Sequence, residues 1–382
     1  MRDVQRGRVR RAEGASVASK EAQRTRRGRA LPLPSLRLVY SREEKGARPP
    51  ARAAAAARSL APLEERDAEG LSWLGTSGSL VVDENGEAVL LRGVNVVGLD
   101  HAKLESGQTL SEALALSDSA LTILTGLWGV NVVRLPFSAR TVLEGNDSLS
   151  AEALLSGLDQ AVADVASAGA YVLLALQSSA LDDATPLPDE ATHECWQLLA
   201  ARFQDEPGVL YEIYAASTPL AAGWADAANR LIGVVRREHP ASLILVSGAS
   251  AGADISDLPL RFSTGEPVHD LAYTVRVAPQ LAPFSRDPRF RFFAQSYPLV
   301  ASQWFDSGPD LGRAADLATQ LFERYGIGWI AANWNAEPRL VTDAAARNYA
   351  ATRFGNAVRR ALGLPVRPQT TPVGADGRWP FP

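Results

Sequence analysis

Residues 128–136 read Trp128-Gly129-Val130-Asn131-Val132-Val133-Arg134-Leu135-Pro136. A short run of β-branched and aliphatic residues that follows a glycine and stops at a proline is typical of a fully buried strand. We therefore predict a strand over 130–136, and the same pattern recurs along the chain. The predicted strands are at 92–97, 130–136, 171–177, 209–215, 243–248, 271–277, 298–304 and 327–334.

Amphipathic helical patterns separate these strands. Apolar residues recur at helical spacing over 159–168, 224–237 and 311–325. Strands that alternate with helices indicate a parallel sheet covered by helices. Eight such strands are the number that closes a (β/α)₈ TIM barrel, whose working face lies at the carboxyl ends of the strands. The sequence therefore predicts an α/β protein with this barrel fold.

An N-terminal β-hairpin is predicted just before the first barrel strand. Residues 80–82 and 88–91 are apolar, and Asn85-Gly86 lies between them. Asn-Gly between two apolar runs favours a tight turn because both residues tolerate positive φ. We expect this hairpin to close the bottom of the barrel.

The ends of the chain differ from its body in composition. Residues 1–58 hold 16 Lys and Arg against 5 Asp and Glu, whereas the remainder holds 23 against 38. We predict a basic, disordered arm over 1–70, the barrel over 71–363 and a Pro-rich tail over 364–382. The arm gives no reason to expect nucleic-acid binding by the barrel. No apolar run is long enough for a membrane span, and no signal-peptide core is visible.

Cysteine and histidine give no sign of a metal or cofactor. Cys195, the single cysteine, lies in an apolar periodic run and is expected to be a buried structural thiol. The four histidines show no metal-ligand spacing, and no Gly-rich phosphate loop or zinc motif is present. We therefore expect neither a metal nor a cofactor.

Several strand ends resemble glycoside hydrolase family 5, the cellulase-type family, in that family's order. Residues 128–136 are similar to its "G-x-N-x-V-R-x-P" strand, the most specific match. The other similar stretches are residues 91–98 (LRGVNVVG), 203–213 (FQDEPGVLYEI) and 329–334 (WIAANW). The resemblance, over roughly 75–360, implies a barrel that acts on oligo- or polysaccharides. It also implies an extracellular protein.

Both glutamates that the resemblance assigns to catalysis are replaced in this sequence. A retaining glycosidase uses one carboxyl group as acid/base and a second as nucleophile. The acid/base position of the family's "Asn-Glu-Pro" corresponds to Ala216, and the nucleophile position corresponds to Gln303. A glutamine amide keeps its hydrogen bonds but cannot act as the carboxylate nucleophile. The family's "Asp-x-His" and "His-x-Tyr" strand ends have also changed, to Gln177 and Arg276.

Two arginines, Arg134 and Arg276, each allow two interpretations. Arg134 matches an arginine of the family, whereas Arg276 replaces a family residue. In the family the residue matching Arg134 holds the nucleophile, so here it could donate to Gln303, or it could be a structural arginine of the barrel. Arg276 could bind an anionic ligand such as a uronate or a phosphate. It could instead pair with Glu212 or Asp306.

Aromatic residues at the strand ends are the other candidates for contact with a sugar. Indole and phenol rings stack on the apolar faces of sugars. Tyr214, Trp304 and Trp334 hold such positions, with core packing as the alternative for each and a ligand role favoured for Trp334. Trp128, Trp196 and Trp224 lie in helical patterns and are expected in the core.

Three functional hypotheses follow. The first is a catalytically inactive, carbohydrate-binding pseudo-glycosidase. The second is an active O-glycosyl hydrolase of the endo-β-glucanase type that uses displaced carboxylates, for which Asp183, Asp306 and Glu337 are the candidates. The third is a structural or interaction protein whose cleft is filled by its own side chains.

Overall fold

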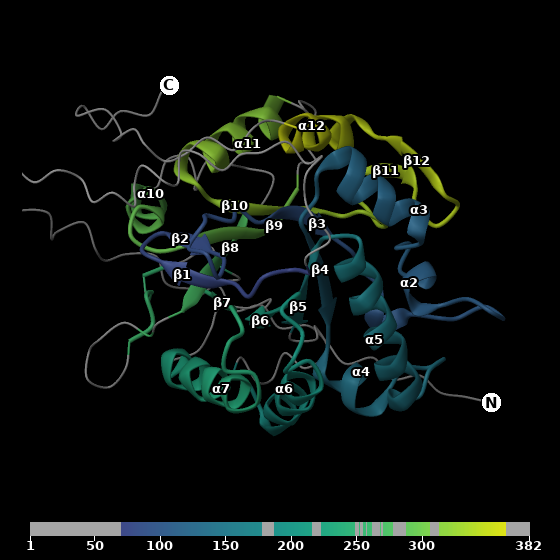
Figure 1. The fold of residues 1–382 in the computed structure, drawn as a ribbon, viewed down its shortest axis with the longest axis horizontal. Helices are drawn as coiled ribbons and strands as arrows, with labels where there is room; N and C mark the ends of the chain where they lie inside the picture. The colour runs from purple at the N-terminus through teal and green to yellow at the C-terminus, as the bar shows by residue number, and fades with distance from the viewer. Residues whose placement is uncertain are drawn as a thin grey trace, which may run out of the picture. The chain divides into compact units, whose positions relative to one another are not determined.

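Eight parallel strands form a closed barrel in the computed structural model (Figure 1). The structure describes residues 70–177, 187–215, 223–248, 252, 255–256, 258–261, 268, 270–277, 288–305 and 313–363. Going round the barrel, the order is β10-β3-β4-β5-β6-β7-β8-β9, so the first strand closes against the last. The strands are β3 (Arg92–Asn95), β4 (Val132–Phe137), β5 (Tyr171–Gln177), β6 (Val209–Ala215), β7 (Ile244–Ser247), β8 (Leu271–Val277), β9 (Leu299–Trp304) and β10 (Gly328–Ala332).

The predicted (β/α)₈ TIM barrel is confirmed, and most strand bounds differ from the prediction by only one or two residues. Strands β5, β6 and β8 have the predicted bounds. Strand β4 begins two residues later than predicted. The side chain of Asn131, just before it, hydrogen-bonds to the backbone at the start of β3. Its side-chain oxygen accepts a hydrogen bond from the Arg92 backbone (2.7 Å), and its amide donates to the Leu90 carbonyl (2.9 Å).

Helices surround the barrel, with α4 to α7 along one side and α11 and α12 along another (Figure 1). The longest, α5, begins eight residues before the predicted pattern because the Ser150 hydroxyl caps it by accepting from the Ala153 amide. The helices are α2 (Leu110–Ala113), α3 (Asp118–Leu121), α4 (Ala139–Glu144), α5 (Ala151–Ser167), α6 (Glu190–Arg202), α7 (Trp224–Glu238), α10 (Pro288–Ala294), α11 (Arg313–Tyr325) and α12 (Arg353–Leu362), with the 3₁₀ turn η2 (Leu99–His101) and the π-helix η3 (Thr122–Trp128).

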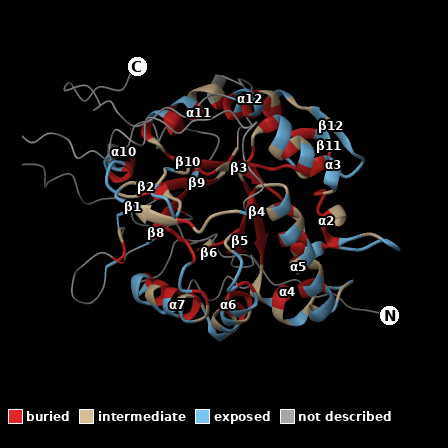
Figure 2. Cartoon of the chain, viewed as in Figure 1, coloured by how far each residue is buried: buried red, intermediate tan, exposed pale blue. Residues whose placement is uncertain are grey.

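The main core lies between the strands and these helices, where the buried faces meet (Figure 2). Trp128, Trp196 and Trp224 are buried there, as the helical patterns predict. Cys195 is also buried, and burial raises the pKa of its thiol far above the ordinary value. A thiol that stays protonated in an apolar setting is a packing group, which confirms the structural interpretation.

A second, smaller core fills the lower half of the barrel. Inward-facing side chains of the strands pack there against the N-terminal segment. They include Val132, Leu173, Leu210, Leu245, Val300 and Ile330 from the barrel, with Leu74 and Val81 from the segment. The N-terminal β-hairpin therefore closes the bottom of the barrel, as expected.

The pairing within that hairpin differs from the prediction. Strand β2 (Leu80–Val82) pairs with β1 (Gly75–Ser77), which precedes it, and not with residues 88–91. Asn85-Gly86 still forms a tight turn, in which the Gly86 amide donates to the Asp83 carbonyl (2.9 Å). Across that turn, however, the two predicted arms share a single described bridge, Val82 with Ala88. The short run Gly75–Ser77 lacks the apolar alternation that would have marked it as a strand.

Acid is expected to weaken the attachment of the N-terminal segment through His239. Its Nδ1 lies 2.9 Å from the Tyr211 hydroxyl, and its ring meets Trp73 edge to face at 5.2 Å. Burial lowers the pKa of His239 from 6.5 to about 4, although the charge of Asp205 opposes the shift. The unfolded chain therefore binds this proton first, and stability falls as the pH drops from 6.5 towards 4.

The expected loss from this group is at most about 3 kcal/mol of unfolding free energy. Urea unfolding at pH 7 and pH 4.5 measures it, with a His239→Gln variant as the comparison because glutamine does not titrate. The variant should show the weaker pH dependence. An equal dependence in both proteins would contradict the assignment.

Candidate functional site

A buried ion pair crosses the middle of the barrel, directly above the lower core. Arg134 of β4 donates from Nε to Oε2 of Glu212 on β6 at 2.6 Å, and both side chains are 1% exposed. A charge removed from water needs a partner of opposite sign, and here each ion supplies it to the other. The Arg134–Glu212 pair is therefore part of the barrel interior.

Three hydroxyl groups from neighbouring strands complete the surroundings of Glu212. Its Oε1 accepts from Ser302 on β9 (2.8 Å), Thr274 on β8 (3.0 Å) and Ser247 on β7 (3.4 Å). Burial alone would raise the pKa of Glu212, but the charge of Arg134 and these hydrogen bonds outweigh it and hold that pKa below the ordinary value. Glu212 is thus an ionised carboxylate without a proton to donate.

On its other side, Arg134 connects to two asparagines at the closure of the barrel. Its Nη1 donates to Oδ1 of Asn95 (2.7 Å), whose amide donates to Oδ1 of Asn333 (2.6 Å). Asn333 in turn donates to the Glu337 carbonyl (3.0 Å). Of the two interpretations of Arg134, the structure supports the structural one, because no hydrogen bond joins it to Gln303 among the described residues.

Two β-bulges decide which side chains reach the carboxyl ends of the strands. Between β8 and β9, Thr274 pairs with Val300 and Val275 with Ala301, but Arg276 pairs with Gln303. Strand β9 therefore holds one extra residue, Ser302, at this point. The extra residue makes Ser302 and Gln303 both face inward, while Trp304 faces the outer core. Bulges often re-aim a side chain beside an active site, and this one directs Gln303 to the mouth.

A bulge in β6 changes the direction in which side chains point at the end of that strand. Ala175 pairs with Glu212, but Gln177 pairs with Ala215, so β6 holds one extra residue between the two pairs. Simple alternation of side chains from Glu212 therefore does not extend to the end of the strand. Tyr214 turns outward and packs on Trp224, with ring centroids 5.7 Å apart.

The mouth of the barrel is lined, among the described strand ends, by polar but mostly uncharged side chains. Gln177 and Gln303 are partly exposed, and Arg276, which pairs with Gln303 in the ladder, is exposed. Arg276 follows Thr274 by two residues, so it faces the barrel axis like the Thr274 hydroxyl that contacts Glu212. The structure thus brings together three of the predicted site residues at one edge.

Arg276 does not form the ion pair with Glu212 that was one of its alternative interpretations, because Glu212 pairs with Arg134. Partial desolvation and the charge of Arg134 lower the pKa of Arg276, and Glu212 opposes the shift. Arginine nevertheless stays protonated at neutral pH. Glu212 influences Arg276 through its charge, from deeper in the barrel. Asp306, the other alternative partner, lies outside the described residues.

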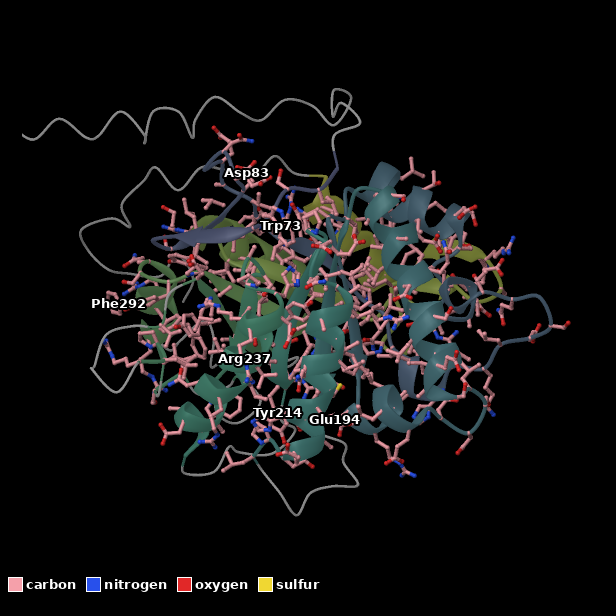
Figure 3. All side chains as sticks on the ribbon, turned by 60° about the horizontal axis from the view of Figure 1, so that its bottom comes forward. Trp73, Asp83, Glu194, Tyr214, Arg237 and Phe292 are labelled. Carbon is pink, nitrogen blue, oxygen red and sulfur yellow. The ribbon has the colours of Figure 1, made fainter. Side chains whose placement is uncertain are left out.

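The three strand-end aromatics are buried, which corrects the interpretation of them as sugar-stacking rings. Trp334 is 0% exposed, donates to the Ala115 carbonyl (2.9 Å) and stacks on Tyr349 with ring centroids 5.7 Å apart. Trp304, 2% exposed, packs edge to face on Phe354. Tyr214 at the end of β6 is 4% exposed. Figure 3 labels its side chain.

Trp334 is covered by a hairpin that the sequence analysis missed. Strands β11 (Val341–Asp343) and β12 (Asn348–Ala351) pair after the last barrel strand, and Tyr349 lies on β12. The strands are three and four residues long, too short for a periodic pattern to indicate them.

The displaced carboxylates fall into two groups. Asp183 and Asp306, like the acid/base position Ala216, lie outside the described residues. Glu337 is described; its side chain is 80% exposed and pairs with Arg339 at 3.1 Å. Glu337 is thus a solvent-facing ion pair beyond β10, while its backbone carbonyl ends the chain of hydrogen bonds from Arg134.

The described part of the chain contains no group of three or more His, Cys, Asp or Glu side chains arranged to hold a metal ion. Its helices include none with the length and apolar content that a bilayer crossing requires.

Comparison with known proteins agrees with the geometry. The family model described as Cellulase (glycosyl hydrolase family 5) matches residues 82–276, slightly more than half of the chain. Comparison with proteins of curated function gives no match.

Solved structures with the same fold include a β-glucanase from Saccharophagus degradans in complex with cellotetraose, with 20% identity and a TM-score of 0.63 over 77% of this chain and 94% of that one. A glutamate-to-glutamine variant of the endoglucanase catalytic domain from Thermobifida fusca, also with cellotetraose, has 19% identity and a TM-score of 0.62 over 76% and 97%. The major endoglucanase of Xanthomonas campestris pv. campestris has 19% identity and a TM-score of 0.57 over 76% and 99%.

Proposed function

The chain belongs to glycosyl hydrolase family 5, and from this premise we propose that it is a pseudo-glycosidase, a barrel that binds an oligo- or polysaccharide without cleaving it. The observation that carries the proposal is Gln303, which the β9 bulge turns toward the mouth and which the sequence resemblance aligns with the family's nucleophile. An amide there can hydrogen-bond a sugar but cannot form the covalent intermediate of a retaining glycosidase.

The remaining carboxylate of the barrel interior does not replace the lost pair. Retaining hydrolysis needs two carboxyl groups about 5–5.5 Å apart on either side of the glycosidic bond. Glu212 is buried, ionised and held by Arg134 and three hydroxyl groups. It therefore has neither access to a sugar nor a proton for the leaving group. Among the described residues, no second carboxyl group shares the interior with it.

Related structures are consistent with binding by such a mouth. The S. degradans β-glucanase and the T. fusca variant were each solved with cellotetraose. The latter carries glutamine in place of a glutamate, so that substitution is compatible with an oligosaccharide complex in a barrel of this fold. Gln177 and Gln303 would supply this chain's amide donors and acceptors for sugar hydroxyls.

Restoring the two carboxylates is expected to create hydrolysis that the natural chain lacks. Reducing-end release from soluble β-glucans, β-mannans and xylans is measured at high protein loading for the full chain and for Ala216→Glu/Gln303→Glu. The natural chain should match a mock preparation. The double variant should exceed it by on the order of 10²-fold, because general acid catalysis alone contributes about that much.

The single variants Ala216→Glu and Gln303→Glu are the matched controls, and each should stay near background. Turnover by the natural chain would contradict the proposal and direct attention to Asp183, Asp306 and Glu337. If the double variant also releases no reducing ends, direct measurement of sugar binding decides whether the barrel still binds a sugar.

One observation favours a second candidate, a structural or interaction protein without a sugar ligand. Tyr214, Trp304 and Trp334, the rings expected to stack on sugar, are all buried. Calorimetric titration with cellohexaose, mannohexaose and xylohexaose distinguishes the two functions. Binding supports the pseudo-glycosidase, and its absence across neutral and acidic sugars supports the second candidate.

A further inference from the structure

We infer that the ligand of this barrel is an acidic oligosaccharide, and that Arg276 binds its uronate carboxylate. This inference deepens the proposed function and rests on it, since it names the class of sugar for the same mouth. It follows from the balance of charge around the carboxyl ends of the strands.

The charges below the mouth cancel each other. Arg134 and Glu212 form one buried pair with side chains 1% exposed, so together they add no net charge. The other polar groups of that layer, including Asn95, Thr274 and Ser302, are neutral. Arg276 lies above this layer and is the one charged residue inside the described barrel strands at their carboxyl ends. Asp100, which follows β3 at the same end, already accepts from the Ser138 amide (2.9 Å) and hydroxyl (3.2 Å). Arg276 is therefore the charged group at these described strand ends that has no polar partner among the described residues.

Arg276 is also free to bind. Its side chain is exposed, and within the described part of the chain no carboxylate comes within ion-pair distance of it. Three exposed arginines elsewhere in the protein, Arg140, Arg347 and Arg360, each pair with an acidic side chain. An unpaired guanidinium facing a barrel axis is suited to a ligand anion.

The backbone around Arg276 holds it in place. In the ladder it pairs with Gln303, which lies on the same face. On another side the chain passes so close at Gly252 that an added Cβ would lie 2.9 Å from the Arg276 amide nitrogen. The Cα of Arg276 is thus fixed from both sides, and its side chain starts toward the barrel axis. The planar fork of a guanidinium matches the two oxygens of a carboxylate.

The replaced catalytic residues point to the same class of ligand. Two glutamates at a mouth would repel an anionic sugar ring, and here the nucleophile position holds neutral Gln303. A neutral amide beside a fixed cation can bind a hydroxyl of the sugar whose carboxylate Arg276 holds. This combination distinguishes a uronate from both a neutral sugar and a bare anion.

A matched pair of ligands tests the inference. Calorimetric titration of the full chain compares cellohexaose with cellohexaose oxidised at C6 to carboxylates, and xylohexaose with its glucuronate-bearing counterpart. The acidic member should bind at least about tenfold more tightly, because a charge-assisted hydrogen bond contributes that much. This advantage should shrink with added salt, which screens exposed charges.

The variants separate Arg276 from general electrostatics. Arg276→Gln should remove the preference for the acidic sugar, measured as the ratio of the dissociation constants of the neutral and acidic members of each pair. Arg276→Lys should keep part of the preference, since lysine keeps the charge but lacks the fork. Arg237→Gln is the matched control. It removes the same charge from an exposed residue near the C-terminal end of α7, and the preference should persist.

Each outcome decides between specific alternatives. Equal binding of neutral and acidic sugars would overturn the inference but leave the proposed function standing. A preference that survives Arg276→Gln would overturn the assignment to Arg276. If inorganic phosphate alone displaced the acidic sugar at similar concentrations, the site would be a bare anion site and the inference would fail. Binding of no sugar at all would overturn both the inference and the proposed function.

Discussion

A Glu212→Gln variant is expected to lose about 3–5 kcal/mol of unfolding free energy, because it leaves Arg134 as an uncompensated charge inside the barrel. Arg134 has 1% of its side chain exposed, so water cannot replace the lost carboxylate. The new amide would also present a donor group near the hydroxyls of Ser302 and Thr274, which now donate to Glu212. Urea unfolding followed by circular dichroism measures the loss.

Glu144→Gln provides the matched control for this prediction. Glu144 pairs with Arg140 at 3.1 Å, but both side chains are exposed, so removing that pair should cost less than about 1 kcal/mol. If the two variants lost the same amount, the buried pair would contribute no more than a surface pair, and the barrel would need another source of stability at its centre.

The lowered pKa of Glu212 gives this prediction a pH dependence with a definite sign. A carboxyl group whose pKa is lower in the folded state stabilises the fold above its unfolded pKa of 4.5. That stabilisation is lost as the pH falls from 4.5 through the lower folded-state value. The difference in stability between the natural chain and Glu212→Gln should therefore narrow in acid.

A Gly93→Ala variant is expected to cost about 3 kcal/mol or more, and little folded protein should be recovered at 37 °C. Strand β3 approaches β4 so closely at Gly93 that a Cβ would lie 1.8 Å from the Val132 carbonyl oxygen. The backbone of a paired strand cannot move aside without disturbing the ladder in which Gly93 pairs with Val132. Yield of soluble protein and the urea midpoint are the measurements.

The same substitution at Gly233 should have the opposite sign. Gly233 is an exposed residue inside α7, and an added Cβ there meets nothing within 4 Å. Alanine favours a helix over glycine by about 1 kcal/mol, so Gly233→Ala should stabilise the protein slightly. Destabilisation by Gly233→Ala, or tolerance of Gly93→Ala, would contradict the packing described here.

Much of the fold could be predicted from local sequence, because each barrel strand is buried on both faces and is therefore a continuous apolar run. Strands β5, β6 and β8 are clear examples. Elements defined by long-range pairing were missed. Strand β1 is marked only by its pairing with β2, and the β11–β12 hairpin only by its cover over Trp334.

The candidate site was predictable in its residues but not in their directions. The positions of Gln177, Arg276 and Gln303 at the carboxyl ends of β5, β8 and β9 could be predicted, because all parallel strands of a barrel end on the same face. The bulges in β6 and β9 could not, since a bulge depends on the register with a neighbouring strand. For the same reason the sequence pattern placed Tyr214 in the mouth, whereas the structure packs it on Trp224.

The buried network explains how a barrel of this family could change its function over evolutionary time. The Arg134–Glu212 pair and its hydroxyl partners join β4, β6, β7, β8 and β9 one layer below the mouth. Substitutions at the strand ends above leave those bonds intact. Active-site residues generally limit stability, and their replacement seldom harms a fold. Selection could therefore relax or redirect the chemistry of the rim while the interior remained under constraint.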